Sequence, residues 1–208
     1  MINNLDDMVI VNVTEEIKQL IKKTNYGDGH IDNCLNSEFL GIEKENEKII
    51  GTGFVGGIFH SYGIEILKEF QGKGIAKRLL AEIINECKQR NFSLISGVFK
   101  PTNLVSVKMH MKVGFIPVFN IYYNTQEGRE IIVILPLNKK GLFFIKLCKL
   151  FDSKFGNLIF AVSFKLMTSF LKNLIAFSGE SISPISISQC FKNFKPTKTI
   201  LEQANEKN

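Results

Sequence analysis

The chain has 208 residues, of which 45% are hydrophobic and 22% are charged. This composition supplies a buried core and excludes a wholly disordered chain or a collagen-like repeat. The net charge is +6, but it is unevenly placed: residues 1–140 carry 17 Lys and Arg against 16 Asp and Glu, and residues 141–208 carry 9 lysines against 4 acids. We therefore expect no nucleic-acid partner for the body of the chain, and any affinity for anionic partners should belong to the last third.

Cysteine spacing and the start of the chain bear on the cellular setting. The four cysteines, at positions 34, 87, 148 and 190, form no CxxC pair, and no Cys/His cluster has zinc-like spacing, so we expect no metal. The first ten residues lack the positive start and the apolar stretch of a signal peptide. These features predict a reducing, cytoplasmic setting.

The first 138 or so residues alternate between helical and strand patterns. Thr14 is a candidate cap for a helix to about Lys23, and residues 24–36 have the composition of a loop or a short irregular helix. Further along the chain, the expected strands are 39–43, 49–59, 62–70, 93–100, 116–123 and 130–137, and the expected helices are 74–90 and 101–113. This order predicts an α/β (α+β) fold, a mixed sheet with flanking helices, over a domain at 1–138.

From Lys139 the composition changes. Residues 141–208 contain 10 of the 18 phenylalanines, and residues 142–155 and 157–177 fit the helical period, with Gly156 as the expected break. Residues 179–188 predict at most a short strand, and the last dozen residues a polar, frayed tail. We therefore expect a basic, Phe-rich helical extension over residues 139–208.

The segment from Phe70 to Leu80, FQGKGIAKRLL, leaves an expected strand and opens the clearest amphipathic helix. Its small residues let the backbone approach a ligand, and the first amides of a helix attract anions, so the segment predicts a pyrophosphate site. A glycine-assisted turn without a ligand is the alternative. A GxGxxG string at residues 51–56 lies inside an expected strand, so we interpret it as chance, and the nucleotide-binding GxxxxGK[ST] pattern is absent.

A second segment, residues 103–115, lies in register with the first. Together the two resemble the GNAT superfamily of acyl-CoA-dependent N-acetyltransferases over residues of about 8–138. The pattern R/Q-x-x-G-x-G/A of that family is matched by Gln71, Gly74 and Ala76, and its N…Y-x-K-x-G-F pattern by Asn103, Lys112, Gly114 and Phe115.

The resemblance implies roles for the matched positions and for their neighbours in the chain. The backbone of Ile66 would pair with the pantetheine arm of acetyl-CoA, the co-substrate, and polarise the thioester carbonyl. The side-chain amide of Asn103 would bind the end of the same arm. The other residues implied in coenzyme binding are Leu67 and Lys68 beside the arm, Gln71, and Gly72, Lys73, Gly74, Ile75 and Ala76 around the pyrophosphate.

The proton-transfer groups are less clear from the sequence. His110 stands where the family usually has the tyrosine that protonates the leaving thiolate; it is either a replacement acid or a helix-surface histidine. Val98 occupies a position where many members carry a carboxylate base and cannot serve. Candidate bases near the strand before the loop are Glu65, His60 and Tyr62, with a water chain as the rival. If the strand is regular, Glu65 and Ile66 face opposite sides of the sheet.

Two functions remain open. The first is an enzyme that transfers acetyl from acetyl-CoA to a primary amine by direct attack; the second is a non-catalytic acyl-CoA sensor or scaffold. The acceptor, a small molecule or a peptide amine, cannot be read from the sequence. For the extension the alternatives are a helical hairpin packed on the sheet or on a second subunit as a homodimer, a lid over the acceptor, and a peripheral membrane-surface helix.

Overall fold

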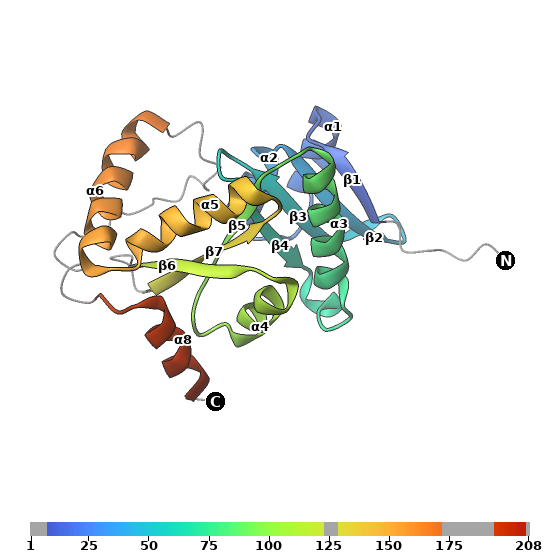
Figure 1. Ribbon diagram of the computed structural model, residues 1–208. Coiled ribbons are helices and arrows are strands. Elements are labelled where there is room, and N and C mark those ends of the chain that lie inside the picture. Colours follow the sequence, from blue (N-terminus) through green and yellow to red (C-terminus); the bar gives the residue numbers. More distant parts are fainter. Residues whose placement is uncertain (1–7, 123–128, 172–193, 207–208) are drawn as a thin grey trace. The chain divides into compact units, whose positions relative to one another are not determined.

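The structure, a computed structural model, describes residues 8–122, 129–171 and 194–206 (Figure 1). These residues form two compact units, one of residues 8–92 and the other of residues 93–171 and 194–206. Every helix in the described ranges is too short or too polar to cross a membrane.

The first unit is an antiparallel sheet in the order β1-β2-β3-β4 with helices on both faces. In chain order its elements are β1 (Met8–Asn12), α1 (Glu15–Lys22), α2 (Asp28–Leu35), β2 (Phe39–Glu45), β3 (Lys48–Gly56), β4 (Ser61–Ile66), the 3-10 turn η1 (Lys68–Phe70) and α3 (Ile75–Gln89). Thr14 caps α1 by accepting a hydrogen bond from the Ile17 amide at 3.3 Å.

Side chains along the strands alternate between the two faces of the sheet and contribute to two hydrophobic cores. Leu40, Ile42 and Phe54 pack under α1 and α2 with Ile21 and Cys34. On the opposite face, the α3 side chains Ile75 and Leu79 pack on the sheet together with Ile64 and Ile66 of β4. The pairing of β4 with β3 shows no register shift, so the expected opposite orientation of Glu65 and Ile66 is confirmed.

The glycines of β3 explain how closely α3 approaches the sheet. A Cβ at Gly51 would lie 2.7 Å from Ile66 Cδ1, and one at Gly53 would lie 2.5 Å from Ile83 Cδ1. Gly51 and Gly53 therefore make room for side chains of β4 and α3, which gives these two glycines a packing role.

The second unit contains β5 (Leu94–Phe99), α4 (Leu104–Val113), β6 (Ile116–Tyr122) and β7 (Arg129–Pro136), with antiparallel strands in the order β5-β7-β6. They are followed by α5 (Lys139–Cys148), the 3-10 turn η2 (Lys149–Phe151), α6 (Lys154–Leu171) and α8 (Thr197–Glu206). Ile145 and Cys148 of α5 are buried against Val118, Phe119 and Ile134 of the strands. The described helices of the extension thus pack on the sheet, as one of the alternatives predicted.

A buried polar network fixes α8. The Asp152 carboxylate accepts hydrogen bonds from the Thr197 amide at 3.0 Å and from the Thr197 hydroxyl at 2.7 Å. The side-chain amide of Asn120 in β6 donates to the Lys195 carbonyl at 2.9 Å. The main-chain carbonyl of Asn120 accepts a hydrogen bond from the Asn157 side chain at 2.6 Å. Asn120, Asn157 and Thr197 are buried and Asp152 is half-buried, so the helix is held by a network of polar contacts that is largely shielded from water.

The fold class is confirmed: it is α/β (α+β), with sheet strands flanked by helices. Three local predictions are wrong. The break in the extension lies at residues 149–153 and not at Gly156, because the Ser153 hydroxyl accepts from the Gly156 amide and so caps the new helix. The last dozen residues, expected as a frayed tail, contain the helix α8. The strand expected at 62–70 ends at Ile66. The strand β1 was not predicted, and residues 179–188 lie outside the described residues.

Cys34, Cys87 and Cys148 are buried free thiols. Burial raises the pKa of Cys34 to about 12, of Cys87 to about 12 and of Cys148 to about 11, because a thiolate would lose its hydration.

Candidate functional site

The segment that joins β4 to α3 forms a turn with outward-facing amides. Gly72 and Gly74 have φ angles of +81° and +78°, which side-chain-bearing residues rarely adopt, and a Cβ on either would meet nothing within 4 Å. The amides of residues 72–76 donate to no other described residue. The loop therefore presents unpaired N–H groups, beside open space, at the positive end of a 15-residue helix.

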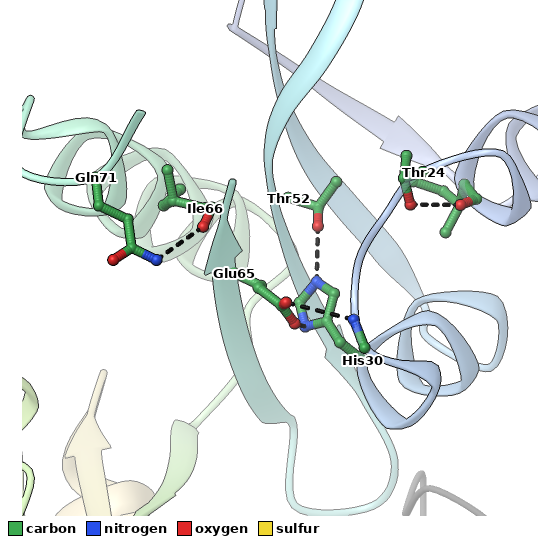
Figure 2. A network of polar contacts seen from close by, with 8 residues as sticks. Thr24, His30, Thr52, Glu65, Ile66 and Gln71 are labelled. Atoms are coloured by element: carbon green, nitrogen blue, oxygen red, sulfur yellow. Dashed lines mark hydrogen bonds and ion pairs between the residues drawn. The ribbon is translucent and has the colours of Figure 1, made fainter. Parts of the chain in front are cut away.

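Side-chain contacts hold this loop in shape. Gln71 Nε2 donates to the Ile66 carbonyl at 3.1 Å, which folds the loop back onto the end of β4 (Figure 2). Arg78 bonds the fully buried Glu43 of β2, and its other terminal nitrogen lies 3.5 Å from the Lys73 carbonyl. The matched Gln71 thus has a visible local role in fixing the backbone that would meet a ligand.

Cations surround the same turn. Lys68, Lys73 and Lys77 are exposed, and Lys73 Nζ lies 4.6 Å from the centre of the Phe70 ring. Ile75 is buried in the core and Ala76 is half-buried, so they anchor the first turn of α3 while their amides remain available. Amides, helix dipole and lysines together make a site suited to a phosphate group.

Ile66 and Leu67 lie where β4 leaves the sheet pattern. The Leu67 amide still donates to the Ile50 carbonyl of β3 at 2.9 Å, and the chain then turns into η1 at Lys68. The predicted pantetheine-binding residues Ile66, Leu67 and Lys68 are therefore continuous with the β4–α3 turn, at the end of the strand.

Glu65 belongs to a polar cluster on the other face of β4 (Figure 2). Its Oε2 lies 3.6 Å from His30 Nδ1, and its Oε1 accepts from the Gly27 amide at 3.4 Å. His30 Nε2 lies 2.7 Å from the hydroxyl of Thr52, the β3 residue paired with Glu65. The Glu65 side chain keeps 39% of its surface exposed, whereas that of His30 keeps 9%. The carboxylate thus reaches solvent while its neighbours are fixed.

Burial determines the charge of His30. It lowers the pKa of His30 to about 4, because the imidazolium would lose its hydration between the rings of Tyr26 and Phe54, 5.3 and 5.4 Å away. A neutral imidazole whose Nε2 accepts from Thr52 carries its proton on Nδ1, facing Glu65. Neutral His30 therefore lies beside the carboxylate without adding a positive charge at neutral pH.

His60 lies at the β3–β4 turn, at the opposite end of β4 from Ile66. It stacks on Phe92 with ring centres 3.7 Å apart, and its Nδ1 lies 3.3 Å from Glu38 Oε1. The six residues of β4 separate it from the phosphate loop by about 20 Å. Tyr62 is buried, and burial raises the pKa of its hydroxyl. Of the candidate bases on or beside β4, Glu65 is the one next to Ile66.

Asn103, in the second unit, begins α4. Its Oδ1 accepts from the Ser106 amide at 3.1 Å, so the side chain is the N-cap of the helix. No hydrogen bond from its Nδ2 occurs among the described residues, and the residue is exposed. Its predicted ligand contact could therefore use Nδ2 while Oδ1 fixes the side chain.

His110 is 5% exposed, which excludes the helix-surface alternative. Its ring packs against Phe99 and Phe115, with centres 5.3 and 5.0 Å away, and its Nδ1 donates to the Ser106 carbonyl at 2.6 Å. Burial lowers the pKa of His110, although the bond to Ser106 opposes the shift. Imidazolium is thus the minor form at neutral pH, which weakens but does not remove a role as acid.

Sequence reasoning missed His30 and Thr52. Both lie outside the two matched motifs, and their relation to Glu65 depends on strand pairing and on the packing of α2. Thr52 lies opposite Glu65 through the observed β3–β4 register, which the expected strand bounds do not specify. In the described part of the chain, no group of three or more His, Cys, Asp and Glu side chains could hold a metal ion.

Residues 14–115 match the acetyltransferase (GNAT) family. A [ribosomal protein bS18]-alanine N-acetyltransferase from Haemophilus ducreyi is 26% identical over 129 residues, which cover 59% of this chain and 89% of that protein.

Solved structures show the same fold. The ribosomal-protein-S18-alanine N-acetyltransferase from Escherichia coli aligns with a TM-score of 0.51 at 15% identity, covering 64% of this chain and 95% of that one. A GNAT family acetyltransferase from Elizabethkingia anophelis, with acetyl-CoA bound, aligns with a TM-score of 0.51 at 19% identity, covering 64% and 100%. Residues 14–115, which include the β4–α3 turn, are thus identified as a GNAT acetyltransferase domain.

Proposed function

We propose that the protein transfers the acetyl group of acetyl-CoA to a primary amine by direct attack. The observation that carries this proposal is the β4–α3 turn: residues 72–76 present unpaired amides beside open space, with exposed lysines around them. That geometry fits a pyrophosphate, the acetyl-CoA-bound relative supports the choice of coenzyme, and family membership supports acyl transfer.

The residues after Glu65 would position the thioester. The phosphates would lie on Gly72, Lys73, Gly74, Ile75 and Ala76, and the pantetheine arm would follow the backbone of Ile66, Leu67 and Lys68. An amide near the end of β4 would then donate to the thioester carbonyl as negative charge develops on its oxygen. Gln71 acts indirectly, through its bond to the Ile66 carbonyl.

Glu65 is the base in this proposal. An amine that arrives as an ammonium ion must lose a proton before its lone pair can attack, and a carboxylate can bind the cation and accept that proton. The position of Glu65 next to Ile66, with its carboxylate held by the Gly27 amide and facing His30, supports this role over His60. His30 acts as a positioning residue.

The reaction balances without an enzyme-bound acyl group. The amine nitrogen forms a bond to the carbonyl carbon and then loses a further proton to solvent, the carbon–sulfur bond of the tetrahedral intermediate breaks, and the thiolate takes up one proton. His110 stands at the position of the family's tyrosine acid and is the candidate donor of that proton; its lowered pKa makes water a competing donor at neutral pH. Asn103 would bind the pantetheine end through its Nδ2.

Two relatives guide the choice of acceptor. Both the H. ducreyi and the E. coli proteins are named for acetylation of the alanine of a ribosomal protein. A protein N-terminal amine is therefore the acceptor class to test first.

The test is thiol release from acetyl-CoA with a panel of acceptors. A peptide with a free N-terminal alanine is compared with the same peptide already acetylated, and small primary amines and an amino sugar complete the panel. Release with a free amine, and a product heavier by one acetyl group, support the proposal. Calorimetric binding of acetyl-CoA without turnover on any amine would favour the non-catalytic acyl-CoA sensor, and no binding would contradict both functions.

A further inference from the structure

We propose that the exposed face of α5, η2 and the first half of α6 docks on an anionic lipid surface. This inference does not depend on the proposed function. Its starting point is a set of large apolar side chains in the second unit that remain in water: Leu142, Phe143, Leu147, Leu150, Phe155 and Ile159. Phe143, Leu150 and Phe155 are 63%, 66% and 69% exposed, values that core-facing side chains do not have.

The opposite face of the same helices is already used. Gly141, Ile145 and Cys148 of α5 are buried, and Asn157 and Ala161 are buried along α6. The exposed apolar residues are therefore the outer face of helices whose inner face packs on the sheet. A globular protein normally places polar side chains on such an outer face.

The charges on this segment have one sign. Residues 139–171 contain six lysines and one aspartate, a net charge of +5. Lys139, Lys140, Lys146 and Lys149 are exposed next to the apolar side chains. The single acid, Asp152, faces inward and accepts the hydrogen bonds that start α8. The outer face is therefore both apolar and basic.

Apolar and basic side chains on one face favour one class of partner over the others. A twofold dimer through this face would bring the same lysines of two chains together, with no acid on the face to pair them. A nucleic acid would satisfy the lysines but offers no aliphatic phase for Leu150 or Phe155. An anionic bilayer offers both, since amphipathic helices with Lys on one side and Phe and Leu on the other lie in the interface plane.

The absence of tryptophan from the chain makes a direct test available. Phe143→Trp introduces a single reporter on the proposed face, and Val105→Trp introduces one on α4, where Val105 is 83% exposed. We expect the emission of the Phe143→Trp protein to shift to shorter wavelength with vesicles of phosphatidylcholine and phosphatidylglycerol, and not with phosphatidylcholine alone. The Val105→Trp protein should show no shift with either.

Sedimentation with the same vesicles tests the contributing residues in the full chain. Replacing Phe143, Leu150 and Phe155 together by serine should lower vesicle affinity by about tenfold or more, and Val105→Ser should leave it unchanged. The double variant with Lys146→Gln and Lys149→Gln should bind the vesicles more weakly, and its binding should depend less on salt concentration. Because all of these side chains are exposed, thermal unfolding should confirm that each variant folds.

Three results would overturn the proposal. The first is an absence of binding to vesicles that contain phosphatidylglycerol. The second is binding that the triple serine variant leaves unchanged, which would mean a non-specific attraction of the basic chain. The third is a full-length dimer that the triple serine variant dissociates, which would identify a second copy as the occupant of the face.

Discussion

Gly74 carries the sharpest prediction about the coenzyme. Its φ of +78° suits glycine, and the space beside it is open, so a substituent would project to where a phosphate is expected. Gly74→Glu should weaken acetyl-CoA binding by at least tenfold, because it adds bulk and like charge at the anion site. Gly74→Asn is the matched control, because asparagine also tolerates a positive φ but adds no charge. Calorimetry on the folded variants gives the answer; equal affinity for the Glu variant and the wild type would refute the phosphate site.

Glu65 and Glu69 form a natural pair for testing the base. Both are glutamates near the end of β4, but Glu65 faces His30 while Glu69 pairs with Lys48 at 3.1 Å. Glu65→Gln should lower kcat by about 10²- to 10⁴-fold. Glu69→Gln should leave kcat unchanged. A Glu65→Gln enzyme with wild-type kcat would assign deprotonation to water.

The burial of His110 sets the sign of its pH dependence. Its folded-state pKa is lowered, so an imidazolium acid would be present only below the usual value of about 6.5 and lost as pH rises through the folded pKa. His110→Phe preserves packing against Phe99 and Phe115 and should lower kcat by about 10²-fold if the residue is the sole acid, with unchanged coenzyme affinity. Profiles of kcat against pH 6–9 for both proteins test this. Superimposable profiles would leave His110 a packing residue.

The two motif-bearing segments show what local sequence can specify. The glycines of the loop and the periodicity of α3 act over a few residues, so they were predicted at their positions. The His30–Glu65 contact was not, because it joins residues 35 positions apart through strand register and the packing of α2. Burial of His110 was also missed, since it depends on the rings of Phe99 and Phe115.

Elements at the ends of the described chain were harder to predict. The strand β1 is only five residues long, so its identity depends on pairing with β2. The helix α8 buries Thr197 and Ile200 but is otherwise polar, which makes its sequence resemble a frayed tail. Its order derives from Asp152, 45 residues away.

The close approach of α3 to β3 gives a prediction about stability. Gly53→Val should lower the free energy of unfolding by about 1–3 kcal/mol or more, because its Cβ alone would press on Ile83. Gly27→Ala is the control: Gly27 has a φ of −62° and open space around it, so its effect should stay within about 0.5 kcal/mol. Urea unfolding of both variants measures the difference; similar losses would mean that the helix is not packed as described.

The extension is integral to the second unit, and its polar network can be tested from one residue. Asp152→Ala removes the acceptor for two donors of Thr197 and should cost about 1–3 kcal/mol of stability. Glu202→Ala on α8 removes an exposed carboxylate 3.8 Å from Lys198 and should cost about 0.5 kcal/mol or less. Thermal unfolding compares the two. If Asp152→Ala is no more harmful than Glu202→Ala, the anchoring of α8 is overestimated.

The buried thiols of the two units can report when each part of the structure opens. Cys34 and Cys87 lie in the first unit and Cys148 in the second. A thiol-specific reagent should react with each only when its surroundings open, since burial both shields the sulfur and suppresses the thiolate. After Cys190→Ser, mass spectrometry of labelled peptides would time these events separately. Simultaneous labelling of all three would indicate one cooperative molecule, whereas early labelling of Cys148 alone would show that the first unit, with its β4–α3 turn, stays folded after the second unit opens.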